Sequence, residues 1–263
     1  MLTDITIGQY IAGNSIIHRL DPRIKIIITI LLITALFFVG NFTGFAIYLV
    51  FIIFIIVLSG ISFKRIFRGL KPILFLVLLT LFLHVFLTGG GEVYWRWKFI
   101  TIEHEGLVTG LFMVTRIILL ISFTSMLTLT TSPLELTDGI EYILSPLKKV
   151  GVPAAELSMM MTIALRFIPT LLEEADKIMK AQMARGADFE SGNLIQRAKN
   201  LVPLLVPLFI SAFRRADELA LAMESRCYRG GAGRTRLHEL KMEGKDIAAL
   251  ILCTFFGIFI AIF

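Results

Sequence analysis

The sequence predicts an all-α integral membrane protein with about five transmembrane helices and about three further helices that are cytoplasmic or lie at the membrane interface. Its 263 residues are 56% hydrophobic and only 17% charged, whereas soluble domains are about 45–50% apolar and about 25% charged. The mean hydropathy is +0.82. The apolar residues form solid runs and do not alternate with polar ones. This pattern favours helices over a β-barrel, because a spanning helix satisfies its own backbone hydrogen bonds.

Five apolar runs are the candidate spans. They cover residues 24–40, about 44–61, 72–88, about 106–131 and 247–263. Asp21 and Pro22 are expected to begin the first helix, since aspartate caps free amides and proline suits the first helical position. Arg23 and Lys25 are expected to extend their charged ends to the same membrane interface. The last run has 17 residues, about the minimum for crossing the hydrocarbon core.

The charges between these runs predict an orientation in the membrane. Basic residues gather in segment 19–25, in a loop at 64–71 and in segment 132–245, and such segments stay in the cytoplasm. The 89–105 loop, with Tyr94, Trp95 and Trp97 as interface aromatics, then lies outside. The N-terminus is therefore expected in the cytoplasm and the C-terminus outside. The net charge of +6 reflects this asymmetry and not the binding of nucleic acid.

The polar segment 132–245 contains more than half of the chain's basic residues and more than half of its acidic ones. It nevertheless predicts helices and not a loop. The first is expected to begin at Ser132 and to end before Gly151. The second follows directly, is expected to bend at Pro169, and ends beside Gly186, which suits the left-handed capping position.

The third helix of this segment is expected to begin near Asn193 and to end near Arg226. Its apolar run 201–213 has 13 residues, which is too short to cross a membrane, and is expected at the interface or against a neighbouring helix. The chain thus divides into a membrane domain (1–131), a cytoplasmic coupling-helix module (132–245) and a C-terminal transmembrane helix (246–263).

Two arginine tripeptides are the main candidate site. They are Ala184-Arg185-Gly186 and Ser225-Arg226-Cys227, and each ends a long helix of the polar segment. Small neighbours allow each guanidinium to enter a groove and pair with a carboxylate there. An arginine near a helix C-terminus also complements the helix dipole, by about 0.3–1 kcal/mol. The repetition of one pattern on two helices favours a pair of docking tips.

No motif for catalysis or cofactor binding accompanies the tips. The phosphate loop, the His-Glu-x-x-His zinc motif and the Gly-x-Ser-x-Gly elbow are absent, so we expect no cofactor, no metal ion and no enzymatic activity. Arg116 is the one charge deep within an apolar run. It is either satisfied by backbone carbonyls or in contact with a partner subunit. Met159, Met160 and Met161 either belong to a core or form an adaptable surface for interchangeable partners.

In combination these residues resemble the transmembrane T component of energy-coupling factor transporters, the vitamin and metal importers of prokaryotes. The resemblance covers nearly the whole chain. It rests on Gly8-Gln9-Tyr10, on His18 to Arg23 with Lys25, on Arg116 with Ser122 to Pro133, on Ala164 to Pro169, on Ala181 to Gly186 and on Met223 to Gly230. The second tip, Ser-Arg-Cys, departs from Ala-Arg-Gly, although its flanking residues are also small.

The resemblance implies the energy-coupling subunit of an ABC-type importer. Two ABC-type ATPase subunits would dimerise in the cytoplasm, and each would accept one arginine tip in a surface groove. The helices of the polar segment would transmit the closure of that dimer to a separate substrate-binding S component in the lipid bilayer, for the uptake of vitamins or other micronutrients. Arg116 and the three methionines are candidate contacts to this S component.

Two other functions are compatible with the residues alone. A self-sufficient permease would bind its substrate within its own spans, and it needs polar or ionisable side chains around a cavity at the membrane midplane. An intramembrane enzyme needs ionisable pairs within the spans. Apart from Arg116 the apolar runs supply few such groups, which favours the coupling subunit.

Overall fold

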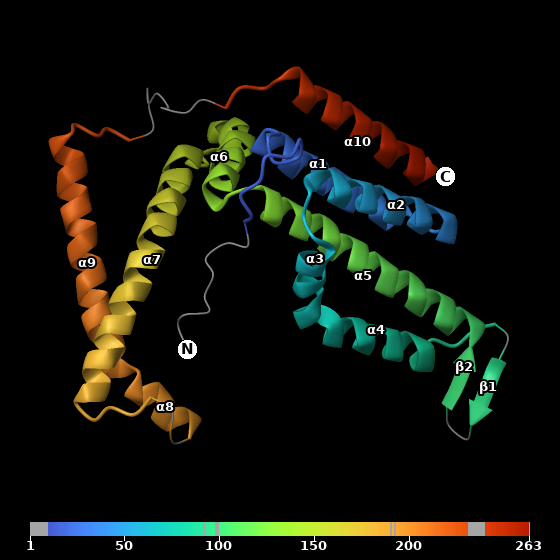
Figure 1. Cartoon of the computed structure of the whole chain (residues 1–263), viewed down its shortest axis with the longest axis horizontal. Helices are drawn as coiled ribbons and strands as arrows, with labels where there is room; N and C mark the ends of the chain where they lie inside the picture. Colours follow the sequence, from blue (N-terminus) through green and yellow to red (C-terminus); the bar gives the residue numbers. More distant parts are fainter. Residues whose placement is uncertain are drawn as a thin grey trace. The chain divides into compact units, whose positions relative to one another are not determined.

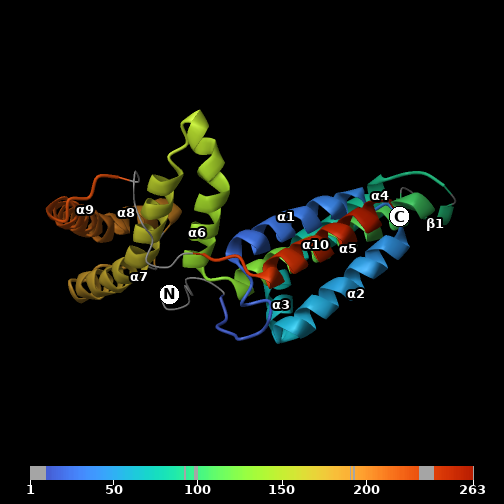
Figure 2. The same ribbon diagram turned by 90° about the horizontal axis from the view of Figure 1, so that it is seen from above.

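The computed structural model describes residues 10–91, 93–97, 100–189, 191, 193–230 and 240–262. Gly8 and Gln9 and the side chains of the expected interface aromatics, Tyr94, Trp95 and Trp97, lie outside the described part. The chain forms two compact units. One comprises residues 8–139 and 239–263, and the other comprises 1–7 and 140–238. Figures 1 and 2 show their helices coloured along the sequence.

The first unit is a bundle of apolar helices with a small hairpin. Its elements are α1 (Pro22–Phe38), α2 (Phe42–Ser59), α3 (Phe63–Leu70), the 3-10 turn η1 (Lys71–Ile73), α4 (Leu74–Leu87), β1 (Val93–Trp97), β2 (Ile100–Glu103), α5 (His104–Thr130) and α10 (Gly244–Ile262). The five apolar runs therefore form helices within a few residues of their predicted positions. The segments Phe42–Ser59, Phe63–Leu87 and His104–Thr130 are long and apolar enough to cross a membrane. Helix α1 has 17 residues, which is about the minimum needed to cross the hydrocarbon core. Helix α10 has 19 residues and is slightly longer than this minimum.

The core of this bundle lies where α1, α2, α5 and α10 meet. Tyr48 of α2 is fully buried, and its hydroxyl donates a hydrogen bond to the Leu32 carbonyl oxygen at 3.2 Å. The rings of Phe123 and Phe256 pack edge-on against the Tyr48 ring, with centroids at 5.9 and 5.3 Å. A buried phenol needs such a hydrogen-bond partner, and the edge-on arrangement suits aromatic rings. One tyrosine therefore joins α2 to three other helices.

Two glycines bring α4 and α5 close together. A Cβ atom at Gly106 would lie 2.6 Å from the Thr88 carbonyl oxygen, and one at Gly110 would lie 3.3 Å from the His84 Cβ. Small residues let helix backbones approach in a membrane, where lipid is as apolar as the side chains and packing decides association. No residue of α4 is itself fully buried within the chain, although α4 packs closely against α5.

The connections of this unit differ from two predictions. Residues 64–71, expected as a loop, form α3 and the start of η1. Their basic side chains point outward while Ile66 is buried, so an amphipathic helix satisfies both the charges and the core. The 89–105 loop contains the antiparallel hairpin β1–β2, in which Trp97 pairs with Ile100.

The second unit consists of long helices that carry the polar segment. Its elements are α6 (Pro133–Leu144), which begins in the first unit, η2 (Ser145–Val150), α7 (Ala154–Ala184), α8 (Leu194–Asn200) and α9 (Val202–Ser225). The predicted start of α6 is confirmed by a reciprocal capping box between Ser132 and Glu135, with N···O distances of 2.9 and 3.3 Å. The predicted third helix is split into α8 and α9 at Leu201, just before Pro203, which has no amide hydrogen to donate.

Helix α7 also has the length and composition of a span. Its apolar first half accounts for this. The second half is more polar and contains Glu173, Glu174, Asp176, Lys177 and Lys180. The assignment of α7 to a cytoplasmic module therefore stays a prediction.

Candidate functional site

Helices α7 and α9 pack against each other and run in opposite directions, so that their C-terminal ends point apart (Figure 1). Glu174 of α7 meets Ser211 of α9 at their contact. At 1.5 Å per residue, Arg185 lies about 16 Å beyond Glu174, and Arg226 lies about 22 Å beyond Ser211. The two tripeptides are therefore at opposite ends of the helix pair, and the structure does not bring them together.

The two tips have the same backbone geometry. Arg185 follows the last residue of α7 and Arg226 follows the last residue of α9, with φ of −91° and −92° respectively. The next residue is left-handed in both cases, with φ of 88° at Gly186 and 57° at Cys227. The prediction that Gly186 adopts the left-handed capping conformation is confirmed.

The hydrogen bonds of the two caps match as well. The Ala187 amide donates to the Gln182 carbonyl oxygen at 3.0 Å, and the Tyr228 amide donates to the Met223 carbonyl oxygen at 3.0 Å. Each bond closes the six-residue loop of a Schellman motif. The sequence analysis found similar helix designs without a repeat in sequence. The structure shows that the repeat is one of backbone conformation.

Both tip arginines are exposed. Within the described part of the chain, neither guanidinium takes part in a hydrogen bond or ion pair with another side chain. The helix C-terminus supplies a partial negative charge near each arginine, as the simpler interpretation expects. The remaining donors of each guanidinium face solvent and can form the planar, bidentate pair that a carboxylate accepts.

A polar clasp holds α7 and α9 where they meet. The Glu174 carboxylate accepts a hydrogen bond from the Ser211 hydroxyl and forms an ion pair with Arg215, with an N···O distance of 2.7 Å. Few apolar side chains are buried in these helices, Ala175 and Leu204 among them. The clasp therefore helps to hold α7 against α9. Sequence reasoning missed it because the partners are 37 and 41 residues apart.

Arg116 contacts a backbone carbonyl and two aromatic rings within the chain. Its Nη2 donates to the Val39 carbonyl oxygen at 3.0 Å, and its guanidinium carbon lies 5.7 Å and 5.8 Å from the ring centroids of Phe37 and Phe45. The carbonyl caps the C-terminal end of α1, where the helix dipole is negative. One backbone carbonyl thus accepts a hydrogen bond from Arg116, but its buried Nε has no hydrogen-bond partner in the described part of the chain. The alternative, a contact with a partner subunit, stays a prediction.

The methionine run lies on the outside of α7. Met160 and Met161 are exposed, while Met159 is half-buried. Exposed, flexible thioether side chains suit a surface that adapts to different partners. Several large side chains of α9 are also exposed, namely Leu205, Val206, Phe209, Ile210 and Phe213.

Charged residues are buried at the start of α1, where Arg23 and Lys25 were expected to reach the membrane interface. That prediction is wrong: Asp21, Arg23 and Lys25 are about 5–6% exposed. Arg23 Nη2 donates to Asp21 at 2.7 Å and to the Leu240 carbonyl oxygen at 2.8 Å. Lys25 Nζ donates to the Thr130 carbonyl oxygen at 3.0 Å. These bonds join α1 to α5 and to the segment before α10.

Asp246 completes this cluster. Its carboxylate accepts the Asp21 amide at 2.8 Å and the Glu243 amide at 2.8 Å, and so it links the starts of α1 and α10. Burial alone would raise the pKa of Asp21, but the hydrogen bonds and charge of Arg23, with a contribution from Lys25, outweigh it, and the pKa lies below its ordinary value. The carboxylate is thus held ionised beside the arginine. The cluster fixes the starts of α1 and α10 relative to each other.

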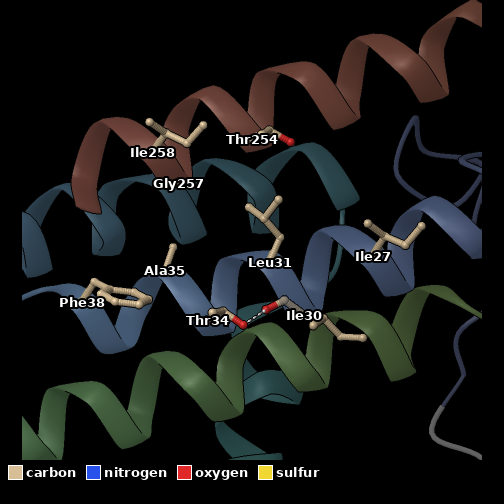
Figure 3. A pocket seen from close by; sticks show the side chains of 9 residues that line it. All are labelled: Ile27, Ile30, Leu31, Thr34, Ala35, Phe38, Thr254, Gly257 and Ile258. Carbon is tan, nitrogen blue, oxygen red and sulfur yellow. Dashed lines mark hydrogen bonds between the residues drawn. The ribbon is translucent and has the colours of Figure 1, made fainter. Parts of the chain in front are cut away.

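A groove of about 480 Å³ runs between α1 and α10 (Figure 3). Its lining comprises Ile27, Ile30, Leu31, Thr34, Ala35, Phe38, Thr254, Gly257 and Ile258. The hydroxyls of Thr34 and Thr254 donate to the backbone carbonyls of Ile30 and Leu250, at 2.8 and 2.7 Å. This lining suits lipid tails or an apolar helix. It lacks the ionisable groups that a permease site for a polar substrate requires.

A family model described as CbiQ, cobalt transport protein, matches residues 13–238. The chain is 61% identical over 250 residues to the energy-coupling factor transporter transmembrane protein EcfT of Clostridium kluyveri, covering 95% of this chain and 93% of that one. It is 62% identical to the EcfT of Thermosediminibacter oceani, with 95% and 94% covered.

A further relative has a lower sequence identity to this chain. The EcfT of Bacillus subtilis is 49% identical over 251 residues, which cover 95% of each chain. Identity at this level over nearly the full length includes both tip helices and the apolar bundle. The chain therefore belongs to the EcfT family, the multi-pass transmembrane coupling subunits of energy-coupling factor transporters, which are not themselves catalytic.

Proposed function

We propose that α7 and α9 couple this subunit to two ABC-type ATPase subunits, with Arg185 docking on one ATPase and Arg226 on the other. Ala184 and Gly186, and likewise Ser225 and Cys227, keep each tip narrow enough to enter a groove. Residues 132–245 then act as the cytoplasmic module, the N-terminus is cytoplasmic and the C-terminus is outside. Closure of the ATPase dimer would move the two tips, and the crossed helices would transmit that movement to a substrate-binding S component for the uptake of vitamins or other micronutrients.

The observation that carries this proposal is the repeated cap at opposite ends of one helix pair. Both tips present an exposed arginine before a left-handed residue, which is what two homologous docking grooves would select. The tips lie about 16 Å and about 22 Å from the contact between α7 and α9, in opposite directions along the helices. This spacing suits two separate ATPase subunits and not one shared groove.

The exposed apolar side chains supply the surface for the S component. Met160 and Met161 on α7 and Phe209 and Phe213 on α9 are uncovered by the chain itself. An apolar surface of this kind marks a protein or membrane contact. We assign Arg116, which is bonded inside the chain, to holding α5 against the end of α1.

Charge reversal tests the proposal. The variant Arg185→Glu with Arg226→Glu is produced together with the two ATPase subunits of its transporter, and their co-purification and the ATP-dependent uptake are measured. Interface arginines that act as hot spots cost about 2 kcal/mol or more each when lost, so we expect the double variant to release both ATPases.

A matched control distinguishes docking from net charge. Arg197→Glu with Arg214→Glu changes the charge equally at exposed positions of α8 and α9, and we expect it to retain the ATPases. Retention of both ATPases by the tip variant, at the level of this control, would refute the assignment of the tips.

A further inference from the structure

Helix α3 and the following turn form a strongly basic surface. Lys64, Arg65 and Arg68 lie on α3 and Lys71 begins η1, and the segment 63–73 has no acidic residue. All four basic side chains are exposed. In the part of the chain that the structure describes, none of them forms an ion pair. Four unneutralised cations on about three helical turns require an anionic partner or bulk solvent.

The same helix exposes large apolar side chains. Phe63 is 45% exposed and Phe67 is 67% exposed. They are four residues apart and so lie on one face of the helix. Ile66 is buried and fixes α3 to the bundle. Basic residues beside exposed aromatic rings are the pattern of a helix that lies in the plane of a membrane surface.

A polar cavity opens beside the start of α3. Its volume is about 240 Å³, and its lining includes His18, Ser59, Gly60, Ser62 and Arg65. Ser62 precedes the first turn of α3, and its side chain caps none of the amides of that turn. A serine hydroxyl and an arginine guanidinium are donors that bind phosphate oxygens.

We propose that α3 and this cavity bind the headgroup of an anionic phospholipid. The phosphate lies in the cavity with Arg65 and Ser62, the other basic side chains lie over neighbouring headgroups, and Phe63 and Phe67 enter the acyl boundary. Position argues for a lipid over a soluble acidic partner. Helix α3 leads through η1 into α4, and the segment Phe63–Leu87 is long and apolar enough to cross a membrane. None of its most apolar stretch is buried within the chain.

Lipid binding by the purified full-length chain tests this inference. Native mass spectrometry, with detergent-solubilised protein titrated with phosphatidylglycerol or phosphatidylcholine, measures the affinity for each lipid. We expect phosphatidylglycerol to bind more tightly, and Arg65→Gln with Arg68→Gln to weaken it by about tenfold or more, because each basic residue near an anionic surface contributes on the order of a fivefold preference. Lys148→Gln with Lys149→Gln, exposed on η2, removes equal charge and should change little.

A folding control and a displacement experiment accompany this measurement. Thermal unfolding establishes that the α3 variant is folded; should it not fold, Lys64→Gln with Lys71→Gln replaces it, since both residues are exposed. Inorganic phosphate or an acidic peptide that displaces phosphatidylglycerol completely at equal concentration would assign the surface to a soluble anion and overturn the proposal. Equal binding of the two lipids, or equal loss in the η2 control, would overturn it as well.

Discussion

Replacing Glu174 by alanine should loosen the crossing of α7 and α9 and let the two tips move independently. The substitution removes the hydrogen bond from Ser211 and the ion pair with Arg215 together. The Arg215 and Glu174 side chains are 35% and 24% exposed, so solvent screens the pair and it contributes about 0.5–1 kcal/mol. A hydrogen bond to a charged group adds about 1.5 kcal/mol.

The sum, about 2 kcal/mol, corresponds to about a 30-fold change in the equilibrium between the crossed and the open pair. Few apolar side chains are buried in these helices, so little else replaces the lost interactions. The result should be a mixture of crossing angles. Because the tips lie about 16 Å and about 22 Å from the contact, a change in the crossing angle also changes the distance between them.

Spin labels at the two tips measure this change directly. Ala184→Cys with Ser225→Cys, in a background without Cys227 and Cys253, gives one distance distribution by double electron–electron resonance. We expect Glu174→Ala to broaden the distribution and to lower ATP-driven uptake while leaving the binding of the ATPases intact.

A neighbouring carboxylate provides the control. Glu173 is exposed, so Glu173→Ala should leave the distribution narrow. Exchange of the charges, Glu174→Arg with Arg215→Glu, should restore part of the order. Two results would show that the clasp does not set the crossing angle of α7 and α9. One is the same distance distribution for Glu174→Ala as for the Glu173→Ala control. The other is a distribution for the variant with exchanged charges that is as broad as that for Glu174→Ala alone.

Three other outcomes follow from the geometry. Cys227→Gly should raise the free energy of unfolding by about 0.5–1 kcal/mol, because a side chain in the left-handed conformation is strained, and this is measurable as a higher Tm with undiminished ATPase binding. Burial, the largest cause, lowers the pKa of His18 from 6.5, so the unfolded chain binds the proton more readily than the folded chain. The contribution of His18 to stability is therefore full above about pH 6.5 and is lost as the pH falls through the pKa of the folded state. A series of Tm measurements against pH should show this loss, and His18→Gln should abolish it. Gly106→Ala places a Cβ 2.6 Å from the Thr88 carbonyl oxygen and should cost about 1–3 kcal/mol, whereas Gly40→Ala, with open space around Gly40, should not.

The helices could be predicted from the sequence because their signals are local. Solid apolar runs located the helices of the bundle, Asp21 and Ser132 marked two helix starts, and Gly186 marked a left-handed cap. Each of these signals depends on residues within one or two turns, where hydrogen-bond geometry is set by the chain itself. The family resemblance was visible for the same reason, since its motifs are short and contiguous.

The packing of charged residues could not be predicted in this way. Arg23 looked like an interfacial residue because its partner Leu240 is 217 residues away in sequence. Glu174 and Arg215 looked like surface charges for the same reason. The left-handed Cys227 did carry a signal, since it occupies the place of Gly186 in the matching tripeptide, but cysteine seldom adopts that conformation. Composition also concealed α3, because four cations in eleven residues suggest a loop until the burial of Ile66 is known.

The bond between Asp21 and Asp246 has a consequence for biogenesis. It connects residues that are 225 positions apart, so the ribosome must deliver nearly the whole polypeptide before α1 obtains its final partner. Until then the Asp21 amide lacks its acceptor on Asp246, and Arg23 Nη2 lacks the Leu240 carbonyl oxygen. The arrival of α10 and of the segment before it therefore completes the hydrogen bonds at the start of α1.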